Sequence, residues 1–219
     1  MKIEVRKNIL ATNAAMAAEN RKRLEAQGVC MINVMASPGA GKTSVITKAI
    51  EGTRDRLNLA VIEGDIASEI DSLAIEAMDI PAIQINTGGS CHLTASMVSS
   101  ALDHLDLGAL DLIFIENVGN LVCPAEFDLG ETGRLVIASV AEGDDKPHKY
   151  PLIFRAVDAI LVNKTDLVDH CDFNLDQFRE VVGGLNPGAP VIELSCRESS
   201  GIDAWCGWLE TKAKSIPCD

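Results

Sequence analysis

The 219-residue sequence has no long uninterrupted hydrophobic segment. No run approaches the roughly 20 consecutive apolar residues that a membrane-spanning helix requires. Residues 1–24 are mixed and charged, without an apolar signal core followed by a cleavage site, so we expect a cytoplasmic protein that does not insert into a membrane. Hydrophobic residues nevertheless make up 47% of the chain, which is ample material for one well-packed core.

Positive charge is scarce. The chain has 19 Lys and Arg against 32 Asp and Glu, a formal net charge of −13. Binding to a nucleic-acid backbone requires a positively charged face, so this balance argues against nucleic acid as the main partner. An excess of acidic side chains keeps a protein soluble.

Cysteines in the C-x₂-C spacing, the strong zinc signature, are also absent. The seven cysteines are odd in number and scattered, which favours a reducing compartment over a disulfide framework. Which of them carry chemistry must therefore be judged from their neighbours in the sequence.

What the sequence does contain is an alternation of β-rich and helical segments. Strands are predicted at 29–36, 57–64, 81–86, 110–118, 134–141, 157–163 and 189–195. Helices are predicted at 42–51, 68–78, 91–104, 174–183 and 201–214. Several of the strands are apolar almost throughout, as expected when both faces of a sheet are covered. The pattern predicts a three-layer α/β/α domain with a mostly parallel sheet of about seven strands.

The chain divides into two parts in this interpretation. Residues 1–28 form an Ala-rich helical arm that ends at Gly28, for packing or contact with a partner. Residues 29–219 form the nucleotide-binding (G) domain, with a metal site embedded in it.

The segment VMASPGAGKTSVI contains most of a phosphate-binding P-loop, G-x-x-x-x-G-K-[ST], with Ala36 at the first glycine position. The glycines let backbone N–H groups surround phosphate oxygens at the positive end of the following helix. Lys42 can reach the β- and γ-phosphates, and the Thr43 hydroxyl can bind Mg²⁺. The predicted phosphate contacts are Pro38, Gly39, Ala40, Gly41, Lys42, Thr43 and Ser44.

The segment LVNKTD, at the end of a predicted strand, resembles the guanine-specificity motif of GTPases. The Asp166 carboxylate can accept two hydrogen bonds from the N1 and N2 donors of guanine, which adenine lacks. The aliphatic stem of Lys164 would lie along the base. In the predicted second base-contacting loop, LSCRESSGID, Arg197 replaces the usual lysine. The predicted base contacts are Asn163, Lys164, Asp166, Ser195, Cys196 and Arg197.

Two acidic residues follow or end predicted strands: Asp65 in IEGDIAS and Glu116 in IFIENVGN. Because the carboxyl ends of adjacent parallel strands meet in one crevice, we expect both, with Thr43, to bind Mg²⁺. Gly119 would offer its N–H to the γ-phosphate, and hydrolysis would release this loop. The alternative is that both acids only cap loops. The predicted catalytic residues are Lys42, Thr43, Asp65, Glu116 and Gly119.

A second candidate site combines Cys91 and His92 in TGGSCHL with Cys123, seven residues after Glu116. Ser90 is predicted to cap the helix over 91–104, which would place Cys91 where the helix dipole favours a thiolate. Two sulfurs and one imidazole suit Zn²⁺ or Ni²⁺ better than Mg²⁺ or Ca²⁺. By spacing alone, inert buried cysteines are an equally good interpretation.

Taken in order, ASPGAGKT, EGD, GGSCHL, ENVGNLVCPAEFDLGE, KYPLIFRAVDAILVNKTDL and IELSCRESSGID closely resemble the HypB family of hydrogenase maturation GTPases, over about residues 30–205. The resemblance implies a SIMIBI-class P-loop GTPase that hydrolyses GTP to GDP slowly and helps load nickel into the large-subunit precursor of [NiFe]-hydrogenase, together with the zinc-containing protein HypA. It also implies a GTP-favoured homodimer that pools metal ligands across a two-fold axis, with Cys91, His92 and Cys123 at the metal positions.

The sequence departs from many HypB relatives at its N-terminal end. It lacks their C-x-x-C-G-C motif and histidine-rich tract, since Cys30 is the first cysteine and no histidine precedes His92. We therefore expect no second nickel site or storage role. The alternatives are a UreG-like urease accessory GTPase, which lacks the NVGNLVCP segment, a GTPase with structural zinc, a small-molecule kinase, which NKTD disfavours, and a redox protein using Cys91 and Cys123.

Overall fold

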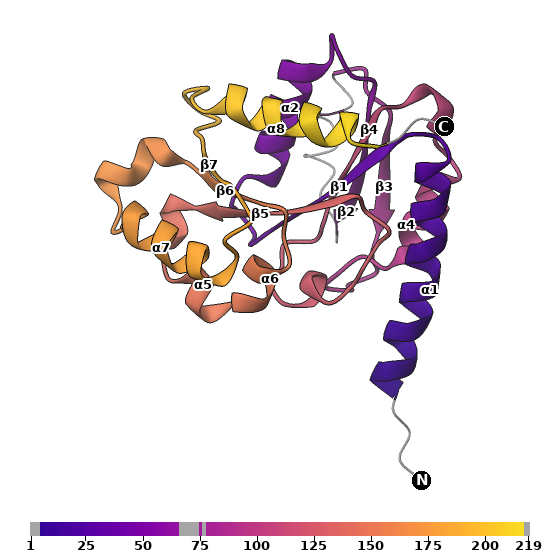
Figure 1. Ribbon diagram of the computed structural model, residues 1–219, viewed down its shortest axis with the longest axis horizontal. Coiled ribbons are helices and arrows are strands. Elements are labelled where there is room, and N and C mark those ends of the chain that lie inside the picture. The colour runs from indigo at the N-terminus through magenta and orange to yellow at the C-terminus, as the bar shows by residue number, and fades with distance from the viewer. Residues whose placement is uncertain (1–4, 66–74, 76–77, 217–219) are drawn as a thin grey trace.

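The structure is a computed structural model that describes residues 5–65, 75 and 78–216. Its centre is a seven-stranded sheet in the order β3-β2-β4-β1-β5-β6-β7, in which every neighbouring pair is parallel (Figure 1). The strands are β1 (Cys30–Ala36), β2 (Leu59–Asp65), β3 (Ala82–Asn86), β4 (Leu112–Glu116), β5 (Gly133–Ser139), β6 (Ala159–Asn163) and β7 (Val191–Glu193). The predicted fold class is confirmed, and all seven strands lie within the predicted segments or extend one residue beyond them.

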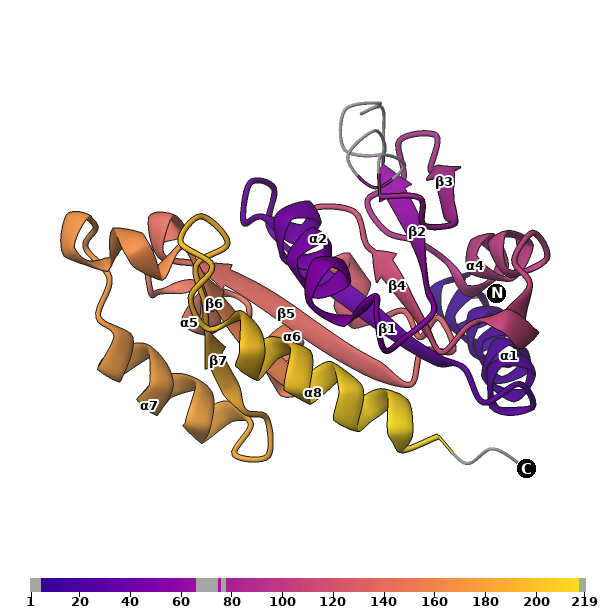
Figure 2. The same ribbon diagram turned by 90° about the horizontal axis from the view of Figure 1, so that it is seen from above.

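Helices cover both faces of the sheet, which makes three layers (Figures 1 and 2). One face carries α2 (Lys42–Thr53) and α8 (Ile202–Lys214), which pack against each other. The helices that pack on the other face are α1 (Val5–Glu25), α4 (Ala95–Leu102), α6 (Pro151–Arg155) and α7 (Leu175–Leu185), with the short α5 (Lys146–Lys149) beside α6 and α7. None of the described helices has the length and hydrophobicity that crossing a bilayer demands.

The central strand β1 shows why the core has this arrangement. Side chains alternate between the two faces of a strand, and Ile32 and Val34 pack in one apolar cluster with α2 and α8. Met31 belongs to a second cluster that includes residues of α1 and α4, and Met35 to a third that includes residues of α6 and α7. Because both faces are buried, β1 reads as a nearly continuous apolar run, as predicted.

Helix α4 corrects one prediction. It begins at Ala95, and its N-cap is Thr94, whose hydroxyl accepts a hydrogen bond from Met97 N at 3.3 Å. Ser90 is therefore not a helix cap, and Cys91 lies in the loop before the helix, so the dipole argument for a thiolate there was wrong. Ser and Thr are both favoured N-cap residues, and the hydroxyl that directly precedes the helix is the one used.

The remaining helices follow the sequence pattern closely. Helices α2, α7 and α8 begin and end within two residues of the segments predicted for them. The helix predicted over 68–78 lies outside the described residues, apart from positions 75 and 78. The connection from β4 to β5, residues 117–132, contains only the short 3₁₀ turn η2 (Cys123–Ala125) instead of an α-helix.

Candidate functional site

The P-loop joins β1 to α2 and has the backbone conformation that only glycine adopts easily. Gly39 and Gly41 have φ of +80° and +96°, in the left-handed region. A Cβ atom on Gly41 would lie 2.5 Å from the Asn163 side-chain nitrogen, so this position also requires glycine for space. Gly41 is the N-cap of α2, and Lys42 and Thr43 open the helix. The first N–H groups of α2 are thereby free to bind an anion.

Two residues of the NKTD segment hold the P-loop in place. Asn163 Nδ2 donates a hydrogen bond to the carbonyl oxygen of Ala40 at 2.9 Å. Lys164 Nζ donates to the carbonyl oxygen of Gly39 at 2.8 Å, so its stem extends from the end of β6 across to the loop. The predicted phosphate-binding and base-binding segments, more than 120 residues apart in sequence, therefore form one hydrogen-bonded unit.

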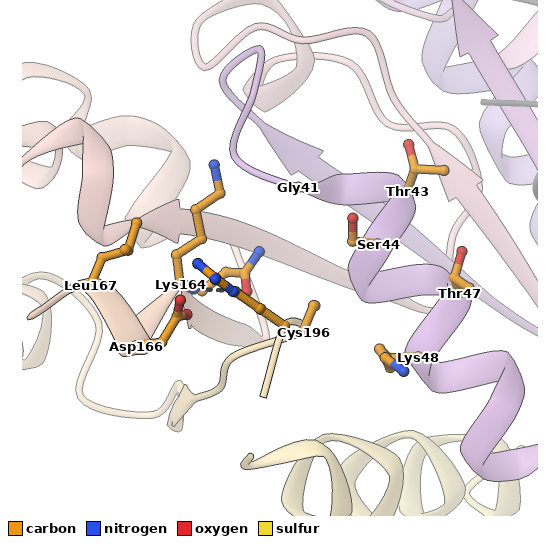
Figure 3. Close-up of a pocket in the computed structure, with 11 residues that line it drawn as sticks. Gly41, Thr43, Ser44, Thr47, Lys48, Lys164, Asp166, Leu167 and Cys196 are labelled. Atoms are coloured by element: carbon orange, nitrogen blue, oxygen red, sulfur yellow. Dashed lines mark hydrogen bonds between the residues drawn. The ribbon is translucent and has the colours of Figure 1, made fainter. Parts of the chain in front are cut away.

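A cavity of about 700 Å³ lies between the start of α2 and the loops that follow β6 and β7 (Figure 3). This volume is within the usual range of small-ligand pockets. The predicted contacts that line it are Gly41, Thr43, Ser44, Asn163, Lys164, Asp166, Cys196 and Arg197. Three lining residues were missed: Thr47 and Lys48, one helical turn beyond Thr43 and Ser44, and Leu167, next to Asp166. Helical periodicity could have found the first two.

At the base end of the cavity, Ser195 Oγ donates a hydrogen bond to Asp166 Oδ1 at 2.6 Å. Ser195 is wholly buried, so this bond fixes the orientation of the carboxylate. Burial raises the pKa of the neighbouring Cys196 thiol to about 11. Cys196 is therefore a neutral thiol at physiological pH and contributes a wall to the cavity instead of a charge.

At the phosphate end, Glu116 terminates β4 and is buried beside the P-loop helix. The Thr43 hydroxyl donates to Glu116 Oε1 at 2.8 Å. A carboxylate and a hydroxyl oxygen are the donors that Mg²⁺ prefers, so this pair fits that ion. Gly119 lies against the P-loop, because a Cβ atom there would be 3.1 Å from Pro38 N. Asp65 ends β2 on the same edge of the sheet, and its side chain lies outside the described residues.

The second candidate site brings Cys91, His92 and Cys123 together, with their ligand atoms all within 4.8 Å of one another. Cys91 Sγ is 3.0 Å from Cys123 Sγ and 3.6 Å from His92 Nδ1. In the part of the chain that the structure describes, no other set of three His, Cys, Asp or Glu side chains is grouped in this way. Cys91 is exposed and the other two are partly buried, so the group is open to solvent.

Two residues that support this group were not predicted. Asn120 Nδ2 donates to the carbonyl oxygen of Cys91 at 3.2 Å, which joins the loop before α4 to the β4–β5 connection. The Phe127 ring packs on the His92 imidazole with centroids 3.9 Å apart. Neither residue type is a metal ligand, so ligand chemistry in the sequence gives no signal for them.

Protonation differs between the ligand types. The hydrogen bond with Cys91, followed by burial, raises the pKa of the Cys123 thiol above its ordinary value. Burial lowers the pKa of His92. At neutral pH the imidazole is therefore neutral and able to coordinate a metal, whereas Cys123 must first lose its proton.

The parallel sheet, with a glycine-rich loop leading from β1 into α2, defines a P-loop nucleotide-binding protein. Residues 30–193 match the nucleotide-binding domain of the CobW/HypB/UreG family.

Comparison with individual proteins shows which branch of this family the chain resembles. The chain is 49% identical to the hydrogenase maturation factor HypB of Azotobacter vinelandii, over 95% of this chain and 69% of that protein. Two crystal structures, HypB from Helicobacter pylori in complex with nickel and HypB from Archaeoglobus fulgidus, both superpose with a TM-score of 0.88 at 36% identity. They cover 93% of this chain and 95% and 99% of those chains, respectively. The chain belongs to the HypB family of hydrogenase maturation factors, as its motifs indicated.

Proposed function

We propose that this chain is a GTP-hydrolysing metallochaperone that assists nickel insertion into the large-subunit precursor of a [NiFe]-hydrogenase. The observation that carries the proposal is the place of Cys123, which lies 3.0 Å from Cys91 and seven residues beyond Glu116 on one continuous segment. A HypB relative crystallised with nickel supports the choice of metal. The formal net charge of −13 supports a protein and a metal, instead of nucleic acid, as the partners.

The proposed nucleotide is GTP, held at both ends of the cavity. The P-loop amides and Lys42 bind the phosphates, and the oriented Asp166 carboxylate accepts two hydrogen bonds from guanine. Thr43 and Glu116, with Asp65, hold Mg²⁺, which neutralises negative charge on the phosphates when bound. The close approach of Gly119 to Pro38 in the P-loop supports the proposal that Gly119 donates its N–H to the γ-phosphate. The expected reaction is GTP hydrolysis to GDP and phosphate.

Nickel is the cargo in this proposal, and its ligands are Cys91, His92 and Cys123. Three ligands on an open surface leave coordination positions to fill, since Zn²⁺ and Ni²⁺ take four or more. A second copy of the chain across a two-fold axis would supply them, which makes the GTP-favoured homodimer part of the proposal. A zinc-containing protein of the HypA type is the proposed partner that exchanges nickel with this site.

The two sites are coupled through the β4–β5 connection. A γ-phosphate that engages Gly119 moves a backbone that reaches Cys123 four residues later. A ligand shifts a conformational equilibrium only by its differential affinity for the two states. Nickel must therefore bind with different affinity in the GTP and GDP states, and the GDP state is the one expected to bind it more weakly.

The test is a Ni²⁺ titration of the parent protein in its GDP form and with a non-hydrolysable GTP analogue. Cys91→Ala and Cys123→Ala are each expected to weaken nickel binding by about tenfold or more, since loss of a supporting contact alone costs that much. Cys171→Ala, a partly buried cysteine outside the group, is the matched control and keeps parental affinity. Equal parental affinities in the two nucleotide states would refute the coupling, and unaltered binding in both site variants would refute the site.

The 3.0 Å approach of the two sulfurs favours a second candidate, a GTPase whose dithiol is a structural zinc site or a redox centre. A structural zinc would stay bound regardless of nucleotide, and the protein would unfold more readily when a chelator removes it. A redox activity would disappear in excess reductant, whereas GTP hydrolysis would continue. The same titration, repeated in reductant, separates these functions from nickel delivery.

A further inference from the structure

The apolar strand β1 contains one amide, Asn33, whose side chain is 0% exposed. Alternation along the strand places it on the same face as Met31 and Met35. Those two methionines belong to different apolar clusters, so the polar side chain of Asn33 lies between the two clusters. A polar group buried in this way is costly unless it is hydrogen-bonded, and both ends of this amide are.

The two partners of Asn33 lie close to the two ends of the β4–β5 connection, since Asn117 is its first residue and Glu131 its last but one. Asn117 Nδ2 donates to Asn33 Oδ1 at 3.0 Å, and Asn33 Nδ2 donates to Glu131 Oε1 at 3.2 Å. Asn117 and Glu131 are 1% and 6% exposed. The segment that carries Cys123 at its middle therefore begins and ends at one buried side chain.

Each end continues toward one of the two sites. On the nucleotide side, Asn117 Oδ1 accepts a hydrogen bond from Val118 N at 2.9 Å, next to Gly119 and its contact with the P-loop. On the metal side, Glu131 Oε2 accepts from Leu129 N at 2.6 Å, two residues beyond Phe127, whose ring packs on His92. We call the three hydrogen-bonded side chains of Asn117, Asn33 and Glu131 the amide relay.

We propose that Asn33 is a positioning residue that, through the amide relay, transmits displacement of the Gly119 loop to the segment that shapes the nickel site. A shift of Asn117 must carry Asn33 with it or leave the buried atoms of that amide without partners, which such networks strongly resist. Glu131 Oε1 also accepts from Arg134 Nε at 2.6 Å, so a displacement of Glu131 would move this ion pair as well. The relay gives a shorter path from the Gly119 loop to the Phe127 segment than the backbone does, because the backbone path runs through the turn at Cys123. This inference rests on the proposed nickel function and deepens it by assigning the residue that couples the two sites.

The experiment compares Ni²⁺ affinity in the GDP form with that in the GTP-analogue form, for the parent and for Asn33→Leu, a variant of similar size that removes both amide bonds. The GDP-form affinity is expected to stay within about threefold of the parent, whereas the ratio between the two nucleotide states falls to about one. Leu209→Ala, a core truncation on the buried face of α8 and away from the relay, is the matched control for lost stability and keeps the parental ratio.

The outcomes distinguish the two proposals. A parental ratio of one refutes the nickel–nucleotide coupling and the relay with it. A parental ratio well above one that Asn33→Leu preserves refutes the relay alone. If Asn33→Leu yields no folded protein, Asn117→Ala decides by the same measurement, because it removes the donor to Asn33 Oδ1, and an unaltered ratio there also overturns the inference.

Discussion

At the scale of single residues, the base end of the cavity depends on one oriented carboxylate. Ser195 donates to Asp166 Oδ1 and has no exposure to solvent, so the side chain is held ready before a nucleotide binds. Preorganisation of this kind lowers the cost of binding. In the proposed function, the outer carboxylate edge recognises the donors of guanine.

Asp166→Asn is expected to weaken GTP binding by about 10- to 100-fold, because each hydrogen bond to a charged acceptor contributes roughly 1.5–3 kcal/mol. The new amide can donate to the 2-oxo group of xanthine, so xanthosine triphosphate should gain affinity as GTP loses it. Competition among GTP, xanthosine triphosphate and ATP measures the change. Asp169→Asn, an exposed acid nearby, serves as the control; an unaltered ranking in Asp166→Asn would contradict guanine recognition by this residue.

The metal ligands give a prediction for pH. The pKa of Cys123 is raised by its hydrogen bond with Cys91 and that of His92 is lowered by burial. Above about pH 7 the imidazole is already neutral, so the remaining proton competition comes from thiols. Nickel affinity should therefore rise between about pH 7 and pH 9, by about tenfold per pH unit for each thiol proton released.

Titrations at several pH values check this slope, and Cys123→Ala should lower it by the contribution of one proton. A nickel affinity that is flat over this range, or that falls with rising pH, would contradict thiolate coordination by Cys123.

At the scale of elements, α1 is hydrogen-bonded to both loops that carry the proposed metal ligands. Asn20 Nδ2 donates to the carbonyl oxygens of Ala95 and Leu129, at 2.8 and 3.0 Å. Ala95 opens α4, just after the Cys91 loop, and Leu129 lies near the end of the β4–β5 connection. Asn13 adds a second link, because its Oδ1 accepts from Ala95 N at 2.8 Å. Helix α1 thus braces the metal loops from outside the sheet.

Asn20→Ala should lower the free energy of unfolding by about 1–3 kcal/mol, because two buried carbonyl groups lose their donor. Asn8→Ala, at an exposed position on the same helix, is the control and should shift it by no more than about 0.5 kcal/mol. Urea unfolding of both variants measures the difference. Equal stability of the two would show that α1 does not brace these loops.

At the scale of the whole molecule, the proposed metal site has only three ligand residues in one chain, and the proposal completes it with a second copy. We expect the protein with Ni²⁺ and a GTP analogue to sediment with twice the mass of the metal-free GDP form. Cys123→Ala should lose the metal-dependent part of this shift and keep any part driven by nucleotide alone. Sedimentation that is identical under all these conditions would contradict a shared site.

Prediction from the sequence succeeded where the signal is local. The buried strands are apolar runs, and NKTD and GAGKT lie where such runs end, so their placement around one cavity follows from the parallel topology. The start of α4 was wrong, because Ser90 and Thr94 both satisfy the capping rule and only the packed helix distinguishes them. Phe127 and Asn120 were missed, because their role depends on which loops meet.

By itself, the sequence determined the sheet, the glycine-rich loop, the predicted base-recognition segment and the residue types proposed as metal ligands. These are encoded in short stretches whose backbone conformation and polarity are decided by neighbouring residues. Only the tertiary structure decided that Cys91 and Cys123, 32 residues apart, place their sulfurs 3.0 Å from each other, and that Asn33 joins both ends of the connection between β4 and β5. Such pairings depend on the path of irregular segments across the sheet, which packing and buried hydrogen bonds select together.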